Sequence, residues 1–253
     1  MSAVFFGHGS PMNALGGNRY AEAWRAFGAR RRPRAILMIS AHWYAAGPRV
    51  TAGEHPRTNH DFVSFRGPLG AFAYPARGDA ALVRRVCELL APVAPALDER
   101  WGYDHGAWSV LANAYPDADV PLVELCIDRT LPAADHYALA RRLAPLRDED
   151  VLVAGSGNVV HNIELLRSGW GGAPAGWQRR FNDDLLARLD RGDHAALIAY
   201  ERLGPDARLA IPTPDHYLPL LYVLGVQRAG ERPQVLVDGD ELGGLGMLSV
   251  AFG

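Results

Sequence analysis

The chain has 253 residues, of which 49% are hydrophobic and 21% are charged, proportions typical of an ordinary globular protein. A length of this order favours one domain, and we expect a single domain over residues 1–253. The net charge of −2 offers no attraction to nucleic acid or to an anionic membrane surface, and the absence of lysine excludes lysine-based covalent catalysis.

No apolar stretch approaches the length of a membrane span, and the N-terminal residues lack the basic and long apolar regions of a secretory signal. Cys87 and Cys126 have no neighbours at metal-ligand spacing, which favours buried, reduced thiols. We therefore expect a cytoplasmic protein without a membrane partner.

Three apolar runs predict buried strands, and each run leads into a histidine. A short apolar run that stops at a glycine is typical of a buried strand reaching its carboxyl end. In open α/β sheets, ligands collect just beyond the carboxyl ends of the strands. The pattern therefore predicts a cluster of imidazoles at one edge of a sheet. The runs and the histidines that follow them are 4–7 with His8, 35–41 with His42, and 151–157 with His161.

The rest of the chain alternates between helical and strand-like patterns. The predicted helices cover 19–31, 78–90, 133–146, 159–167, 175–190 and 193–200, with others ending near 115 and opening at 215; the further predicted strands are 49–52, 120–127, 234–237 and 247–252. Such alternation predicts an α/β fold with a central, mostly parallel or mixed sheet and helices on both faces. Residues 44–76 are irregular and rich in Gly, Pro, His and aromatic residues, which is typical of a binding loop.

Nine histidines occur, and most of them must have ordinary structural roles. His55, His136 and His194 lie in polar or helix-surface contexts, and we expect solvated side chains there. His60 lies in the irregular segment and fits a structural role or a substrate-facing role equally well. His105 stands beside Asp104; it is either an acid/base oriented by a carboxylate or a loop residue with a local contact.

The three histidines that follow strands, together with His216 near the start of a predicted helix, are the candidates for a metal site. Any one of them alone is explained as a hydrogen-bonded loop histidine. Together they indicate a site assembled from distant segments, since no HExxH motif or similarly clustered spacing occurs. Imidazole is a ligand for Zn, Fe, Cu and Ni.

Six motifs, taken together, resemble the class III extradiol ring-cleavage dioxygenases, and most closely their DOPA-type (4,5-DOPA extradiol dioxygenase) branch. They run in the order of that family over nearly the whole chain. The motifs are GHGSPMN at 7–13, SAHW at 40–43, HDF at 60–62, DHGAW at 104–108, SGNVVHN at 156–162 and TPDHYLPL at 213–220.

The resemblance implies an α/β fold with one mononuclear divalent metal at the C-terminal ends of the strands, bound by His8, His42 and His216. It implies that His161 is either a fourth ligand or the acid/base, and that His105 is a second catalytic histidine. The motif at 60–62 implies that His60 and Asp61 contact the substrate. The better-known protocatechuate-cleaving members of the superfamily have a glutamate where this chain has His216. An all-histidine site also suits Zn(II), so we expect Fe(II) for dioxygenase activity and Zn(II) as a second occupant.

The implied reaction opens the ring of a small-molecule catechol with O2 to give a muconic semialdehyde. Triplet O2 reacts slowly with a closed-shell catechol, so a redox metal that holds both reactants supplies proximity and orientation. A histidine that titrates near neutral pH can accept the catechol proton and return it later. We assign this step to His161, with His105 steering substrate or oxygen.

Two other classes of function remain open. A zinc-dependent hydrolase of an amide or ester can use the same histidines, with His161 as the base. A non-enzymatic binding protein on this scaffold is disfavoured because the full set of pocket histidines is present. Neither the natural catechol nor the oligomeric state follows from the sequence.

Overall fold

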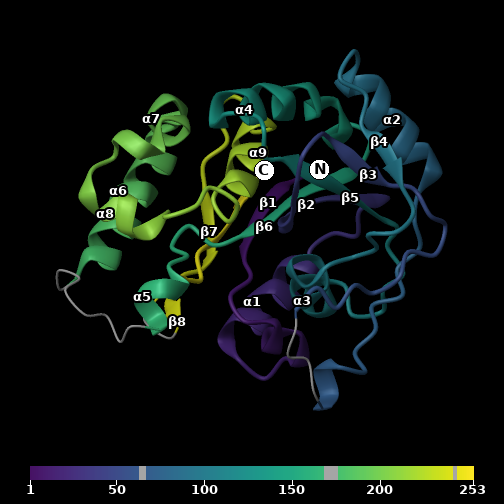
Figure 1. Ribbon diagram of the computed structural model, residues 1–253, viewed down its shortest axis with the longest axis horizontal. Coiled ribbons are helices and arrows are strands. Elements are labelled where there is room, and N and C mark those ends of the chain that lie inside the picture. Colours follow the sequence, from purple (N-terminus) through teal and green to yellow (C-terminus); the bar gives the residue numbers. More distant parts are fainter. Residues whose placement is uncertain (63–66, 168–175, 242–243) are drawn as a thin grey trace.

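A computed structural model describes residues 1–62, 67–167, 176–241 and 244–253. These residues form an α/β fold around an eight-stranded mixed sheet with the order β4-β3-β5-β2-β6-β1-β10-β7 (Figure 1). The predicted fold class is therefore confirmed.

The centre of the sheet consists of four buried strands that run parallel to one another. Their sequences are nearly continuous apolar runs, because helices cover both faces of a parallel sheet and bury the side chains on each face. In the order in which they pair, the four are β5 (Leu122–Asp128), β2 (Ala35–Ala45), β6 (Val151–Gly157) and β1 (Ala3–Gly7). Their carboxyl ends meet at one edge, where the sequence predicts the histidines.

Alternate residues of β1 face two separate cores, one on each side of the sheet. Phe5 packs into a core that includes residues of α4 (Ala133–Arg142) and α9 (Leu218–Gly225), whereas Phe6 packs into a core that includes Trp24 and Trp108. Helices α1 (Arg19–Gly28) and α3 (His105–Ala114) lie together on the second side, and α4 and α9 lie on the first (Figure 1). The two layers hold the strand ends rigidly on both faces.

The remaining helices are α2 (Ala80–Leu90), α4 (Ala133–Arg142), α5 (Ile163–Arg167), α6 (Trp177–Arg191), α7 (His194–Ile198), α8 (Pro205–Ala210) and α9 (Leu218–Gly225). The remaining strands are β3 (Arg49–Thr51), β4 (Ala96–Asp98), β7 (Gln234–Val237), β8 (Asp240–Glu241), β9 (Leu245–Gly246) and β10 (Ser249–Phe252). Short 3-10 helices occur at Pro11–Leu15, Gly67–Leu69, Ala144–Arg147 and Tyr200–Arg202. None of the helices in the described ranges is long and apolar enough to cross a membrane.

Several predicted boundaries are wrong. The helix expected over 159–167 starts only at Ile163, because residues 159–160 form bends and the backbone of His161 is hydrogen-bonded to a distant segment, with His161 N donating to Ala210 O (2.8 Å). The helix expected to open at 215 begins at Leu218. Strands β4, β8 and β9 and helix α8 were not predicted; each is six residues or shorter and carries little periodic signal.

Two of the three histidines expected in solvent are held by hydrogen bonds instead. His136 is fully buried, with Nδ1 3.0 Å from the Tyr222 hydroxyl, because α9 packs on the face of α4 that carries it. His194 is half-buried and contacts Tyr137 and Gln227 through its two ring nitrogens. His55 is exposed, as predicted.

A buried arginine joins the two ends of the chain. Arg147 is 1% exposed and donates five hydrogen bonds: from Nε to Met1 O (2.7 Å), from the two Nη atoms to both carboxylate oxygens of Glu231 (2.8 and 2.6 Å), and to the carbonyls of Val226 (2.8 Å) and Phe252 (3.1 Å). Every N–H of the guanidinium is therefore used.

Candidate metal centre

Three histidines from distant segments converge beyond the carboxyl ends of the central strands. His8 follows β1, His42 lies inside β2, and His216 precedes α9. Their ring centroids are 5.0 to 5.4 Å apart in all three pairs. The Nε2 atoms of His8 and His42 are 3.2 Å apart. Strand β2 runs on to Ala45, beyond its predicted end at 41, and His42 lies where its pairing with β5 is irregular, between Ile39 and Tyr44.

The outer nitrogen of His8 is fixed by a serine. Ser156 Oγ donates to the carbonyl of Gly106 (2.6 Å), so its lone pairs face His8 Nδ1 at 2.9 Å. His8 must then carry its proton on Nδ1 and donate it to Ser156. The inward Nε2 of His8 is left with a bare lone pair, the form that binds a metal.

His216 has the same tautomer for a different reason. Its Nδ1 contacts the carboxylate of Asp215, which can only accept a hydrogen bond when it is ionised. Its Nε2 is buried and has no hydrogen-bond partner among the described residues. The helix expected to open at 215 starts three residues later, and the carboxylate of Asp215 faces the imidazole of His216.

Tight backbone packing places His216 next to β6. A Cβ added at Gly157 would lie 2.1 Å from the carbonyl oxygen of His216, so only glycine allows this approach. The same carbonyl accepts a hydrogen bond from Asn158 N (3.0 Å). The glycine at the end of β6 therefore sets the position of a histidine almost sixty residues further along the chain.

His105 and Asp61 form a hydrogen-bonded pair beside this group. The carboxylate of Asp61 accepts from the ring Nδ1 of His105 (2.8 Å) and from its backbone N (2.9 Å). It also lies 3.6 Å from Nδ1 of His42, whose ring centroid is 3.7 Å from that of His105. The carboxylate next to His105 in space is thus Asp61, whereas Asp104 caps α3 and accepts from Ser40 (2.6 Å).

The other sequence-predicted residues lie at the border of the cluster. His161 stacks on His216 with 3.4 Å between centroids and 6° between planes. Exposed His60 lies 6.0 Å from the ring of Trp108, which is 6.2 Å from that of His105. Ligand atoms of His8, His42 and His105 lie within 4.8 Å of one another, and those of His161, Asp215 and His216 form a second such group. Ring contacts through His216 link His161 to His42 and His105, and exposed His60 lies beside Trp108.

Burial keeps these imidazoles neutral. Burial, followed by the neighbouring histidines, lowers the pKa of His8 and His216 well below the usual value. Burial and His105 lower the pKa of His42 to about 3. Burial also lowers the pKa of His161, although Asp215 opposes the shift. Neutral imidazoles present the lone pairs that metal binding requires.

The inward nitrogens fit a divalent metal. Two nitrogens bound tetrahedrally at 2.0–2.1 Å lie about 3.3 Å apart, and 3.2 Å separates Nε2 of His8 from Nε2 of His42. The buried Nε2 of His216, which has no hydrogen-bond partner among the described residues, supplies a third donor. A metal among these three would satisfy an otherwise costly buried polar atom.

A pair of fully buried carboxyl groups lies behind the site, and the sequence did not reveal it. Asp104 and Glu124 both lie near the indole N–H of Trp101, at 3.4 and 3.3 Å. Burial raises the pKa of Asp104, and burial together with Asp104 raises that of Glu124 well above its usual value. One acidic residue inside the apolar run 120–127 was the available signal for this pair.

Two hollows lie near the cluster. One, of about 600 Å³, is lined by His161 and by the apolar side chains of Ile163, Leu165, Leu209 and Pro212. It makes His161 accessible to a small molecule.

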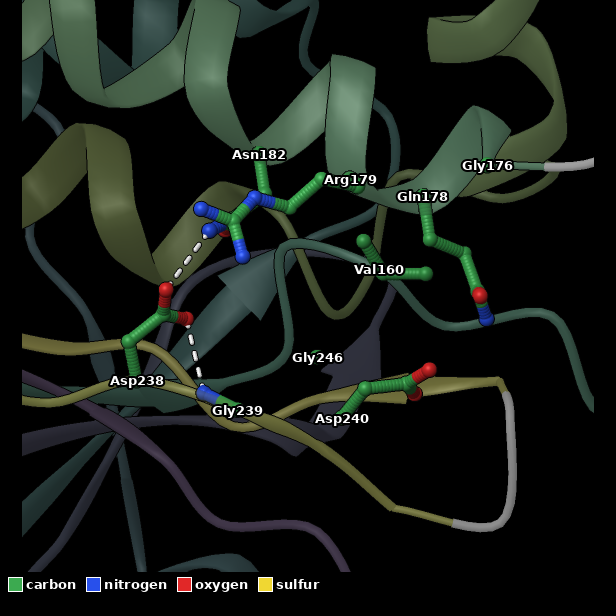
Figure 2. A pocket seen from close by; sticks show the side chains of 9 residues that line it. All are labelled: Val160, Gly176, Gln178, Arg179, Asn182, Asp238, Gly239, Asp240 and Gly246. Carbon is green, nitrogen blue, oxygen red and sulfur yellow. Dashed lines mark hydrogen bonds between the residues drawn. The ribbon is translucent and has the colours of Figure 1, made fainter.

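The other hollow, of about 200 Å³, lies between α6 and the segment that contains β8 and β9 (Figure 2). Its polar groups bond to each other: Asp238 accepts from Asn182 (2.9 Å) and from the backbone N of Gly239 (2.8 Å). No histidine lines it, so it is separate from the metal centre.

Comparison with known proteins agrees with this geometry. The model of the family described as the catalytic LigB subunit of aromatic ring-opening dioxygenase matches residues 8–252. The chain is 46% identical to the "4,5-DOPA dioxygenase extradiol" of Escherichia coli K12, covering 100% of this chain and 95% of that one. It is 36% identical to the protein of the same name from Beta vulgaris, covering 90% and 86%. The crystal structure of an uncharacterized Escherichia coli K12 protein superposes over the full length of both chains, with a TM-score of 0.84 and 42% identity.

Proposed function

This chain belongs to the LigB family of class III extradiol ring-opening dioxygenases, and we propose that it opens the ring of a catechol with O2 to give a muconic semialdehyde. We propose further that residues 1–253 act as a single catalytic domain, with one divalent metal held by His8, His42 and His216. The main support is the set of inward nitrogens: two facing Nε2 atoms and a third that is buried without a partner among the described residues. Small-molecule substrates and O2 are the partners that this family implies.

With Fe(II) bound, the centre would supply the redox chemistry and the binding positions that bring catechol and O2 together. The all-imidazole donor set also suits Zn(II), so we propose zinc as an inactive occupant.

We propose His161 as the acid/base. It lines the hollow of about 600 Å³, a volume within the usual range for small-molecule sites. Burial lowers its pKa, so it starts neutral and can take the proton of a catechol hydroxyl. Its stacking on His216 holds the ring beside the proposed metal. If His161 is instead a fourth ligand, its removal should also lower the metal content.

We propose that His105 steers substrate or oxygen. The hydrogen bond from its Nδ1 to Asp61 fixes Nε2 as the acceptor nitrogen. Asp61, expected to contact substrate, already accepts two hydrogen bonds from His105, so we propose that it acts by holding that ring. His60 is exposed, and we propose that it contacts substrate at the entrance.

The decisive experiment is anaerobic removal of metal, loading with Fe(II), and measurement of O2 uptake with a panel of catechols. DOPA is the first substrate to test, since relatives carry the name 4,5-DOPA dioxygenase extradiol. One O2 consumed per catechol and a yellow semialdehyde are expected, with loss of activity after hydrogen peroxide oxidises the iron. No O2 uptake with any catechol, together with ester or amide hydrolysis by the zinc form, would replace this proposal with the hydrolase.

A further inference from the structure

The three proposed ligands carry no negative charge. His8, His42 and His216 are neutral imidazoles in a buried site, and a divalent cation among them brings a charge that nothing in direct contact offsets. An uncompensated buried charge is costly. The compensation must therefore come from groups just outside the ligand nitrogens.

The outer nitrogens of the ligands have different partners. Nδ1 of His8 meets the neutral hydroxyl of Ser156 at 2.9 Å. Nδ1 of His216 is hydrogen-bonded to the carboxylate of Asp215. Nδ1 of His42 lies 3.6 Å from Asp61, whose closer partner is His105 at 2.8 Å. Only His216 has a carboxylate in direct hydrogen-bond contact among these three ligands in the described chain.

We propose that Asp215 supplies negative charge to the metal centre through His216, without contacting the metal. The proposal rests on the metal-binding part of the proposed function. A carboxylate that accepts the Nδ1 proton increases electron density at Nε2 and makes the imidazole a stronger donor. Asp215 is thus a positioning residue: it fixes the tautomer of His216 and gives a neutral ligand partial anionic character.

Three variants separate charge from hydrogen bonding. Asp215→Asn keeps a carbonyl oxygen that can accept the Nδ1 proton but removes the charge. Asp215→Glu restores the charge. Ser156→Ala removes the neutral partner of His8, together with the hydrogen bond from Ser156 to Gly106 O, and changes no charge, so it measures the effect of lost hydrogen bonds without a change in charge. The matched control is Asp238→Asn, the same substitution at a carboxylate that bonds to Asn182 and lines the separate hollow.

The readout is the dissociation constant for Zn(II), measured without catechol by competition with a chromophoric chelator. Asp215→Asn should weaken binding by roughly 10- to 100-fold, the usual effect of removing a partner of a metal-ligating histidine. Asp215→Glu should recover most of the lost zinc affinity. Ser156→Ala should lose less zinc affinity than Asp215→Asn, and Asp238→Asn should bind zinc as tightly as the native chain. The d–d absorption bands of the Co(II)-loaded chain should shift in Asp215→Asn and stay unchanged in Asp238→Asn.

Native affinity in a folded Asp215→Asn protein, checked by circular dichroism and thermal melting, would overturn the proposal. So would X-ray absorption that finds a carboxylate oxygen bound to zinc in the native chain and missing in the variant, because Asp215 would then be a direct ligand. The proposed function is tested separately. Asp215-dependent zinc binding without O2 uptake by the Fe(II) form contradicts only the dioxygenase. O2 uptake by the Fe(II) form, with zinc affinity that does not depend on Asp215, contradicts only the role of Asp215.

Discussion

Two buried polar centres of this chain use their hydrogen-bonding groups in opposite ways. At Arg147 every N–H has an acceptor, and the ionised partner Glu231 receives two of the five bonds. At the histidine cluster, two Nε2 atoms face each other at 3.2 Å, and Nε2 of His216 has no hydrogen-bond partner among the described residues. The first centre is complete without a ligand, and the second is not.

An unpartnered buried atom does not by itself mark a binding site. Nε2 of His136 is also buried without a hydrogen-bond partner in the described chain. The ring of His136, however, packs against Tyr222 and not against another imidazole. What distinguishes His216 is that its unpartnered nitrogen belongs to a group of rings with centroids about 5 Å apart. Convergence of unsatisfied groups is therefore the informative observation.

The largest effect should come from removing a proposed ligand. His8→Ala, His42→Ala or His216→Ala should each lose most of the bound metal, and O2 uptake should fall to background because the redox centre is absent. Metal content is measured after reconstitution by elemental analysis. His55→Ala, at an exposed histidine, is the control and should keep full occupancy. Full occupancy in all three ligand variants would remove the basis for calling the cluster incomplete.

The next effect concerns the proposed acid/base. His161→Ala should lower the turnover number by roughly 10²–10⁴, the usual contribution of a positioned proton acceptor. Metal content decides the role of the ring: it should stay constant if His161 only transfers protons and fall if His161 is a fourth ligand. Near-native turnover in this variant is incompatible with both roles.

A substitution at Arg147 should lower the stability of the fold and leave the turnover number per bound metal unchanged. Arg147→Met removes the donor to three carbonyls and leaves the carboxylate of Glu231 with the backbone N–H of Arg228, so the free energy of unfolding should fall by about 3 kcal/mol. Denaturant unfolding measures this loss. Arg179→Met, which breaks an exposed pair with Asp183, should change the free energy by no more than about 0.5 kcal/mol. A reduced turnover per bound metal in folded Arg147→Met would show that the two centres are coupled.

The smallest effect is a pH dependence at the same centre. Burial alone would raise the pKa of Glu231, but the hydrogen bonds from Arg147 outweigh it and hold the pKa below its ordinary value of 4.5. A depressed folded-state pKa gives stability that is present above the unfolded pKa and is lost as the pH falls through the folded pKa. The free energy of unfolding of the native protein should therefore be larger than that of Glu231→Gln by about 1 kcal/mol at pH 7. This difference should shrink below pH 4.5. A difference that grows on acidification contradicts this sign.

The central strands and the histidines near their ends could be predicted from local sequence patterns. Short apolar runs that stop at glycine report local chain geometry, and parallel strands bring their carboxyl ends to one edge. That reasoning located His8 directly after β1, His161 four residues beyond the end of β6, and His42 at the same edge although it lies within β2. His216 has no strand directly before it; its place near the start of a predicted helix made it a candidate, and the family resemblance then implied that it is a metal ligand.

The hydrogen-bond partners of the histidine rings depend on the tertiary structure and not on the neighbouring sequence. The neighbour of His105 in sequence is Asp104, but the carboxylate that holds its ring is Asp61, 44 residues away. Likewise His136 looked solvent-exposed from its own helix, and α9 packs over it. The physical reason is common to both cases: periodicity and turn residues act over a few positions, whereas hydrogen-bond partners and burial depend on which distant segments the folded chain brings into contact.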